Sequence, residues 1–112
     1  MKILVIEPLT KPYTKEIDGS LESMQKIVGG LIQAIYPYED KDVALVCNEE
    51  AKLIGLPFNR ALYDDKGQIY DIIAGTFFLC QAPADSENFE SLNDEQIKQF
   101  KEKYRYSEIY LK

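Results

Sequence analysis

The chain has 112 residues, the length of one ordinary domain that can bury its own core. Its 19 acidic and 13 basic side chains give a net charge of −6, which disfavours direct binding to the phosphate backbone of nucleic acids. Because 46% of the residues are apolar and no apolar run approaches the roughly 18 residues that span a bilayer, we expect one soluble globular domain over residues 1–112, with no membrane segment.

The chain begins with a predicted strand, a loop and a helix. Lys2–Ile6 is a short apolar run with β-branched residues, which is typical of a strand. Leu9–Gly19 is polar and rich in turn-forming residues, so we expect a loop. Asp18 or Ser20 can cap a helix over Leu21–Val28, where apolar residues recur at spacings of three and four.

Two strands and a long loop are predicted next. Gly29-Gly30 ends the helix, because a glycine adopts the left-handed C-cap conformation at little cost. Leu31–Tyr36 and Val43–Cys47 are predicted strands, and the short charged stretch between them favours antiparallel pairing. One helical turn is expected over Glu50–Leu53, and Ala61–Gln68 is expected to be a loop.

The last third predicts one strand and one well-signalled helix. The apolar run Ile69–Cys80 is divided by Gly75, and its second part is the clearer strand. Asn93 is the expected N-cap of a second helix, with Gln96 completing a capping box. The alternating tyrosines of the segment Tyr104–Lys112 hint at a final strand.

The predicted order is therefore β-α-β-β-β-α, with a possible final β. This order indicates an α+β (or α/β) domain, a mixed sheet of about four to five strands with two helices packed on it.

The composition argues against catalysis. The chain has no histidine, so the commonest general base is absent. Cys47 and Cys80 lie inside apolar runs without metal-ligand spacing, which indicates buried thiols in a reducing cytoplasm. No phosphate-binding glycine loop is present. We therefore expect a cytoplasmic protein that is not an enzyme and that has no cofactor and no metal site.

One polar cluster is a candidate site for a ligand or a partner. It follows the apolar strand at Val43–Cys47 and consists of Asn48, Glu49, Lys52, Asn59 and Arg60. The arginine offers a planar fork for phosphate or carboxylate, and the two asparagines offer amide recognition. The alternative interpretation is structural: the asparagines hold turns, and the arginine pairs with a nearby carboxylate.

Two further features have both a functional and an ordinary interpretation. The eight tyrosines suit a protein interface, but tyrosine is equally common at the rim of a sheet core. The stretch Asp85–Glu95 carries five carboxylates in eleven residues, which suits either a DNA-mimicking surface or ordinary solubility.

Several short motifs in a fixed order carry a resemblance to a known family. They are Ile3–Pro8, Met24–Gly30, Asn48-Glu49, Lys52-Leu53, Gly55-Leu56-Pro57, Asn59-Arg60 and Ile73–Phe78. With these motifs the chain resembles the domain-of-unknown-function family DUF3846, small proteins of phages, plasmids and conjugative elements, chiefly of Gram-positive bacteria. The resemblance implies a mobile-element accessory protein of the bacterial cytoplasm, and it supplies no catalytic residues.

These observations lead to three functional hypotheses. The first is a non-enzymatic accessory protein that binds a protein partner. The second is a domain that binds a small polar ligand, a nucleotide or an anion, through the Asn48–Arg60 segment. The third is an acidic DNA mimic that inhibits a host defence system. The sequence does not determine the oligomeric state or the order of strands in the sheet.

Overall fold

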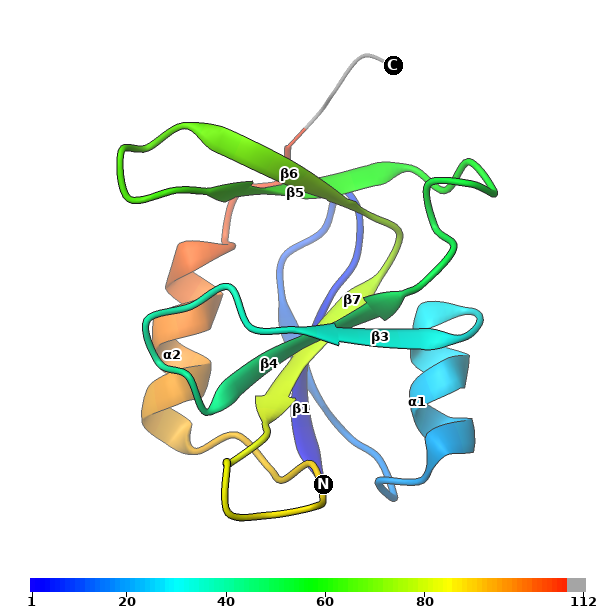
Figure 1. The fold of residues 1–112 in the computed structure, drawn as a ribbon, viewed down its shortest axis with the longest axis vertical. Coiled ribbons are helices and arrows are strands. Elements are labelled where there is room, and N and C mark those ends of the chain that lie inside the picture. Colours follow the sequence, from blue (N-terminus) through cyan, green and yellow to red (C-terminus); the bar gives the residue numbers. More distant parts are fainter. Residues whose placement is uncertain (109–112) are drawn as a thin grey trace.

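The structure is a computed structural model that describes residues 1–108 (Figure 1). Within these residues the chain forms a five-stranded sheet, a separate two-stranded hairpin and two helices. In chain order the elements are β1 (Lys2–Ile6), β2 (Tyr13–Glu16), α1 (Leu21–Val28), β3 (Ile32–Ile35), β4 (Val43–Asn48), β5 (Phe58–Tyr63), β6 (Ile69–Ala74), β7 (Phe77–Gln81) and α2 (Asp94–Lys103).

The five-stranded sheet has the order β2-β1-β7-β4-β3, and every neighbouring pair is antiparallel. The predicted α+β class is confirmed, and the sheet is antiparallel throughout rather than mixed. Strand β4 is buried along its whole length because it lies between two strands and is covered on both faces. The predicted antiparallel pairing of β3 with β4 is also confirmed, with Gln33 opposite Cys47.

The two faces of the sheet are covered differently. On one face, Met24 and Val28 of α1 pack against the alternate residues of the inner strands, such as Val5 and Val46. On the other face, α2 and the β5–β6 hairpin share one core with the sheet. Figure 1 shows α1 and α2 at opposite sides of the molecule, with the hairpin crossing one end of the sheet. This arrangement gives each helix one apolar side to bury.

Both ends of α1 and the start of α2 lie where the sequence predicted them. Ser20 caps α1 by accepting a hydrogen bond from the backbone N–H of Ser23, and Gly29 ends the helix in the left-handed conformation. Asn93 and Gln96 form the predicted capping box at the start of α2. These ends were predictable because capping depends on residues that are close in sequence.

Three sequence predictions need correction. Tyr13–Glu16 forms the edge strand β2, although the sequence indicated a loop. Phe58–Tyr63 forms β5, so the loop predicted over Ala61–Gln68 begins only after Tyr63. The run Ile69–Cys80 contains two strands, β6 and β7, in different sheets. Of the hinted final strand, residues 104–108 form no strand and residues 109–112 lie outside the described residues.

The two helices of residues 1–108 have eight and ten residues, and neither is long and apolar enough to cross a membrane.

Candidate functional site

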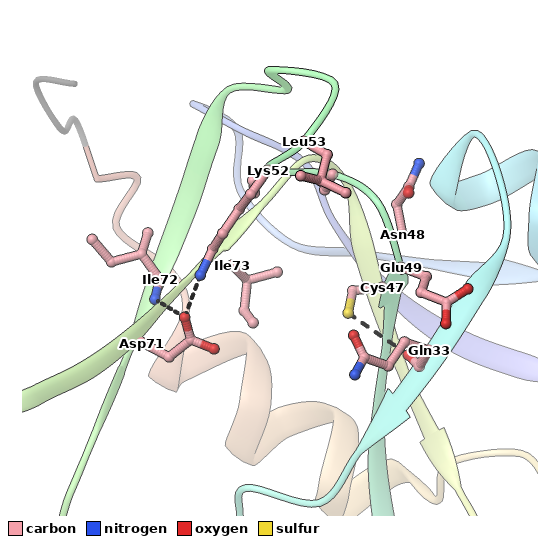
Figure 2. Close-up of a pocket in the computed structure, with 11 residues that line it drawn as sticks. Gln33, Cys47, Asn48, Glu49, Lys52, Leu53, Asp71, Ile72 and Ile73 are labelled. Atoms are coloured by element: carbon pink, nitrogen blue, oxygen red, sulfur yellow. Dashed lines mark hydrogen bonds and ion pairs between the residues drawn. The ribbon is translucent and has the colours of Figure 1, made fainter.

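A small pocket lies where β4 ends and the chain turns toward β5 (Figure 2). Its volume is about 140 Å³, and it is lined by residues of β3, β4, the following turn and β6. Three of the five predicted site residues, Asn48, Glu49 and Lys52, line this pocket. We call it the β4-end pocket.

The side chain of Asn48 forms hydrogen bonds with the backbone around the pocket. Its buried side chain donates from Nδ2 to the carbonyl oxygen of Val28 at 3.2 Å, and its Oδ1 accepts from the backbone N–H of Glu50 at 2.8 Å. These bonds join the end of β4 to the end of α1 and set the turn that follows. The turn-holding interpretation therefore describes Asn48 correctly.

Charged side chains stand on two walls of the β4-end pocket. Lys52 forms an ion pair with Asp71 of β6 at 2.5 Å, and the same Asp71 oxygen accepts from the backbone N–H of Ile72. Figure 2 shows Gln33 and Glu49 on the opposite wall. Since both partners of the ion pair are partly exposed, the pair adds at most about 1 kcal/mol to stability. The pocket therefore holds two carboxylates and one ammonium group.

Asn59 and Arg60 lie elsewhere, fully buried between the hairpin and the sheet. Asn59 Nδ2 donates to the carbonyl oxygens of Ile6 and Gly75, both at 2.9 Å. The predicted five-residue cluster is therefore divided: Asn48, Glu49 and Lys52 line the β4-end pocket, whereas Asn59 and Arg60 are internal.

Sequence reasoning missed two polar residues of the β4-end pocket, Gln33 and Asp71. Asp71 had a signal, since it is the one charged residue in the apolar run Ile69–Cys80. Gln33 had none, because a polar residue on a half-exposed strand is ordinary.

A second and larger depression lies on the α2 side of the molecule. It is an open cleft of about 480 Å³ between residues 37–41, the end of the β5–β6 hairpin and α2. Tyr63 and Tyr70 line it and are 51% and 56% exposed. Its charged lining consists of Glu39, Asp40, Asp64, Asp65, Lys41 and Lys103. We call it the tyrosine cleft.

Two of the four acids in the tyrosine cleft are engaged locally. Asp40 accepts from the side-chain amide of Gln96 and from the backbone N–H of Asp42. Asp64 accepts from two backbone N–H groups of its own turn. Glu39 and Asp65 are exposed, which leaves them accessible to a basic partner.

The two cysteines are free and buried, as predicted. Burial raises the pKa of the Cys80 thiol to about 12, and burial also raises the pKa of Cys47, with the negative charge of Asp71 adding to the effect. Both thiols are therefore protonated at neutral pH, which is unfavourable for nucleophilic chemistry.

Comparison with known families gives one result. Residues 1–105 match the family described as "Domain of unknown function (DUF3846)". The chain belongs to this family. No curated protein and no solved structure matches it.

The fold explains several of the motifs by which this DUF3846 chain resembles its family. Asn48, Asn59 and Arg60 are buried and hydrogen-bonded to the backbone of distant segments. Gly75 has a φ of +76° at the junction of hairpin and sheet. These motif residues therefore stabilise the fold.

The acidic stretch of the DUF3846 chain, which runs from the loop after β7 into the first turn of α2, is exposed at all five of its carboxylates, Asp85, Glu87, Glu90, Asp94 and Glu95. Asp94 lies 3.7 Å from Lys2. The DNA-mimic hypothesis stays a prediction.

Proposed function

We propose that this DUF3846 protein is a non-enzymatic accessory protein of a phage or other mobile element, acting in the bacterial cytoplasm by binding a protein partner. The tyrosine cleft is the surface that receives this partner. The observation that carries the proposal is the pair of half-exposed rings, Tyr63 and Tyr70, on the wall of an open cleft. Tyrosines of this kind are enriched at protein interfaces because they bury a large ring while keeping a hydrated hydroxyl.

The charge of the tyrosine cleft defines the chemistry of the partner. Four carboxylates and two ammonium groups line it, which leaves an excess of negative charge. A segment containing arginine fits this lining, because the guanidinium group stacks on tyrosine rings and forms two hydrogen bonds with a carboxylate. We therefore expect a basic segment of a protein to bind here.

Binding of short peptides to the purified protein tests the proposal. An arginine-containing peptide should bind, and a peptide of the same length with glutamate in place of arginine should not. Tyr70→Ser should weaken binding about tenfold, since stacked rings at exposed sites contribute roughly 1 kcal/mol or more. Tyr106→Ser is the matched control, because Tyr106 is 71% exposed and does not line the cleft. Equal affinities of the two variants in calorimetry would refute the assignment of the cleft.

A second candidate function rests on the β4-end pocket. The pocket holds Glu49 and Lys52 on facing walls, and this favours a small ligand that carries both a cationic and an anionic group. A volume of about 140 Å³ is smaller than that of ordinary pockets for drug-sized ligands, so a whole nucleotide does not fit inside.

Thermal-shift measurements with amino acids, small anions and nucleotides test this second candidate. A ligand present at 100 times its dissociation constant stabilises the folded state by about 2.7 kcal/mol. Glu49→Gln should abolish the shift, and Glu50→Gln should leave it unchanged, because Glu50 is exposed and does not line the pocket. A shift that survives Glu49→Gln would remove the pocket from consideration.

A further inference from the structure

The five-stranded sheet ends in two edge strands of different character. Edge strand β2 is exposed along its whole length and carries Lys15 and Glu16, and such charges discourage pairing with another chain. Edge strand β3 has the sequence Ile-Gln-Ala-Ile, without a charge or a proline, and it pairs with β4 without a bulge. Within residues 1–108 no strand pairs with its outer edge, and Figure 1 shows β3 at the front of the sheet. The β3 edge is therefore open and unprotected.

The register shows which backbone groups of β3 point outward. The backbone N–H of Glu49 donates to the carbonyl oxygen of Leu31 at 2.8 Å, so these opposite residues form a hydrogen-bonded pair. Hydrogen-bonded pairs alternate along an antiparallel ladder, so Gln33 and Ile35 also direct their backbone groups toward β4. The backbone N–H and C=O groups of Ile32, Ala34 and the adjacent Tyr36 therefore point away from the sheet.

We propose that two copies of this chain pair through their β3 edges, antiparallel, about a twofold axis at Ala34. In this register each Ala34 exchanges its N–H and C=O with the Ala34 of the second copy, and each Ile32 does so with the opposite Tyr36. These are the backbone N–H and C=O groups that point away from the sheet, so each of them gains a hydrogen-bond partner. The result is a continuous ten-stranded sheet made from two five-stranded ones.

Side chains and charge favour a second copy as the occupant. Ile32 and Ala34 of β3 face α1. Continuing this alternation one residue past the strand places the half-exposed ring of Tyr36 on the same face, where it meets Ile32 of the second copy. Gln33 stands opposite Ile35 on the other face. No charged pair is opposed along this edge, so the net charge of −6 on each copy does not bring like charges together there. This inference goes beyond the partner-binding function and does not depend on it.

Sedimentation equilibrium over a protein range of about 1 to 500 µM tests the proposal. We expect a monomer–dimer equilibrium with a dissociation constant on the order of 10 µM, because a single short strand pair is a small interface. A sample that stays monomeric over the whole range overturns the proposal.

A proline pair provides matched variants. Ala34→Pro removes the N–H at the twofold axis, and proline is tolerated on an edge strand where the N–H faces solvent. Thr14→Pro is the control on the other edge: the N–H of Ile17 bonds to Met1, so the alternation along β2 directs the N–H of Thr14 outward as well. We expect at least a tenfold weaker dimer for Ala34→Pro and no change for Thr14→Pro. Equal dimerisation of the two variants overturns the proposal.

Two further measurements test the proposal if circular dichroism shows that Ala34→Pro does not fold. Gln33→Lys places a charge at an exposed edge position and should weaken the dimer by at least tenfold. In hydrogen exchange, the amides of Ile32, Ala34 and Tyr36 should become protected as the protein concentration rises. Unchanged exchange of the Ala34 amide across the range, or an unaffected Gln33→Lys dimer, contradicts pairing through β3.

Discussion

Arg60 joins three parts of the chain at one buried point. Its Nη1 donates to Oδ1 of Asn59 at 2.8 Å, and its Nη2 donates to the carbonyl oxygens of Thr10 at 2.8 Å and of Tyr104 at 3.0 Å. Thr10 belongs to the loop between β1 and β2, and Tyr104 is the C-cap of α2. The guanidinium charge also stands at the negative end of the α2 dipole. The planar fork reaches acceptors on three segments at once from its two terminal nitrogens.

Replacing Arg60 with lysine should therefore be strongly destabilising. A lysine ammonium is a single point on a flexible stem, so it leaves some of these buried acceptors without a donor, at about 2 to 4 kcal/mol. Urea unfolding measures this change in the free energy of unfolding. Arg105→Lys is the control, since Arg105 is exposed and pairs with Glu102 on the surface, and we expect a change within about 0.5 kcal/mol. Equal effects at both positions would contradict the role given to Arg60.

A buried tyrosine pair makes stability sensitive to alkaline pH. The hydroxyl groups of Tyr38 and Tyr104 lie 2.8 Å apart in the core beneath α2. Burial raises the pKa of Tyr104 to about 12, and burial together with the neighbouring Tyr104 raises the pKa of Tyr38 well above its usual value. In the unfolded chain both groups ionise near pH 10.

We expect stability to be insensitive to these groups below pH 10 and to fall between pH 10 and pH 12. Over that window the folded state keeps protons that the unfolded state has lost, so raising the pH favours unfolding. The loss should be about 2 kcal/mol for a shift such as that of Tyr104. Tyr104→Phe should flatten the decline in urea midpoints, whereas Tyr106→Phe should not, since Tyr106 is exposed. Parallel declines in both variants would assign the alkaline loss to other groups.

At the scale of the elements, Gly75 directs the chain from the hairpin into the sheet. It lies between β6 and β7, has a φ of +76°, and donates its N–H to the carbonyl oxygen of Pro57 at 2.7 Å. A Cβ atom at this position would lie 2.8 Å from Cδ1 of Leu56. Glycine is therefore favoured here by the left-handed backbone, and an added Cβ would also force the end of the Leu56 side chain to move.

Gly75→Ala should lower the free energy of unfolding more than Gly67→Ala does. The difference between the two measures the contact with Leu56. Both glycines have a positive φ, but an added Cβ at Gly67 meets nothing within 4 Å. We expect the free energy of unfolding to fall by about 1 kcal/mol for Gly67→Ala, from backbone strain alone, and by about 2 kcal/mol for Gly75→Ala. Leu56→Ala in the Gly75→Ala background should recover part of the difference in a double-mutant cycle. Equal costs at the two glycines would mean that Leu56 moves aside freely.

The elements also show which parts of the fold the sequence could predict. Both helices were predictable because their caps and apolar spacing are local signals. β2 was not, since all its residues are exposed and no apolar alternation exists to detect. β5 was not, because Gly55 and Pro57 precede it and its Asn59 and Arg60 are polar. Polar residues such as arginine are usually exposed, so the sequence pattern predicted a loop where the structure has a buried strand.

At the scale of the whole molecule, tertiary structure divides the predicted site. Nearness in sequence grouped Asn48, Glu49, Lys52, Asn59 and Arg60, but tertiary structure separates them into a pocket and an interior junction. Neither Gln33 nor Asp71 is close in sequence to this group: Gln33 reaches the β4-end pocket because β3 pairs with β4, and Asp71 reaches it because the hairpin packs on the sheet. A site assembled by long-range strand pairing and packing cannot be predicted from one sequence without the fold.

Within residues 1–108 the hairpin does not pair with any strand of the five-stranded sheet, and we expect it to open as a separate unit. It forms its own two-stranded sheet, contributes Leu62 and Ile73 to the shared core, and is tied by Asn59 to Ile6 of β1 and to Gly75, at the junction between β6 and β7. Units of this kind open at lower free energy than the core strands. The two buried hydrogen bonds from Asn59 are therefore expected to control how often the hairpin leaves the sheet.

Asn59→Asp tests this, because the carboxylate has the same shape but cannot donate to the carbonyl oxygens of Ile6 and Gly75. We expect a loss of about 2 to 4 kcal/mol that is local: amides of β5 and β6 should exchange faster in native-state hydrogen exchange, and those of β4 and β7 should keep their protection. Asn48→Asp is the matched control, since Asn48 is buried and donates to Val28, so faster exchange should appear at the end of α1 instead. Uniform acceleration over all elements would show that hairpin and sheet unfold as one unit.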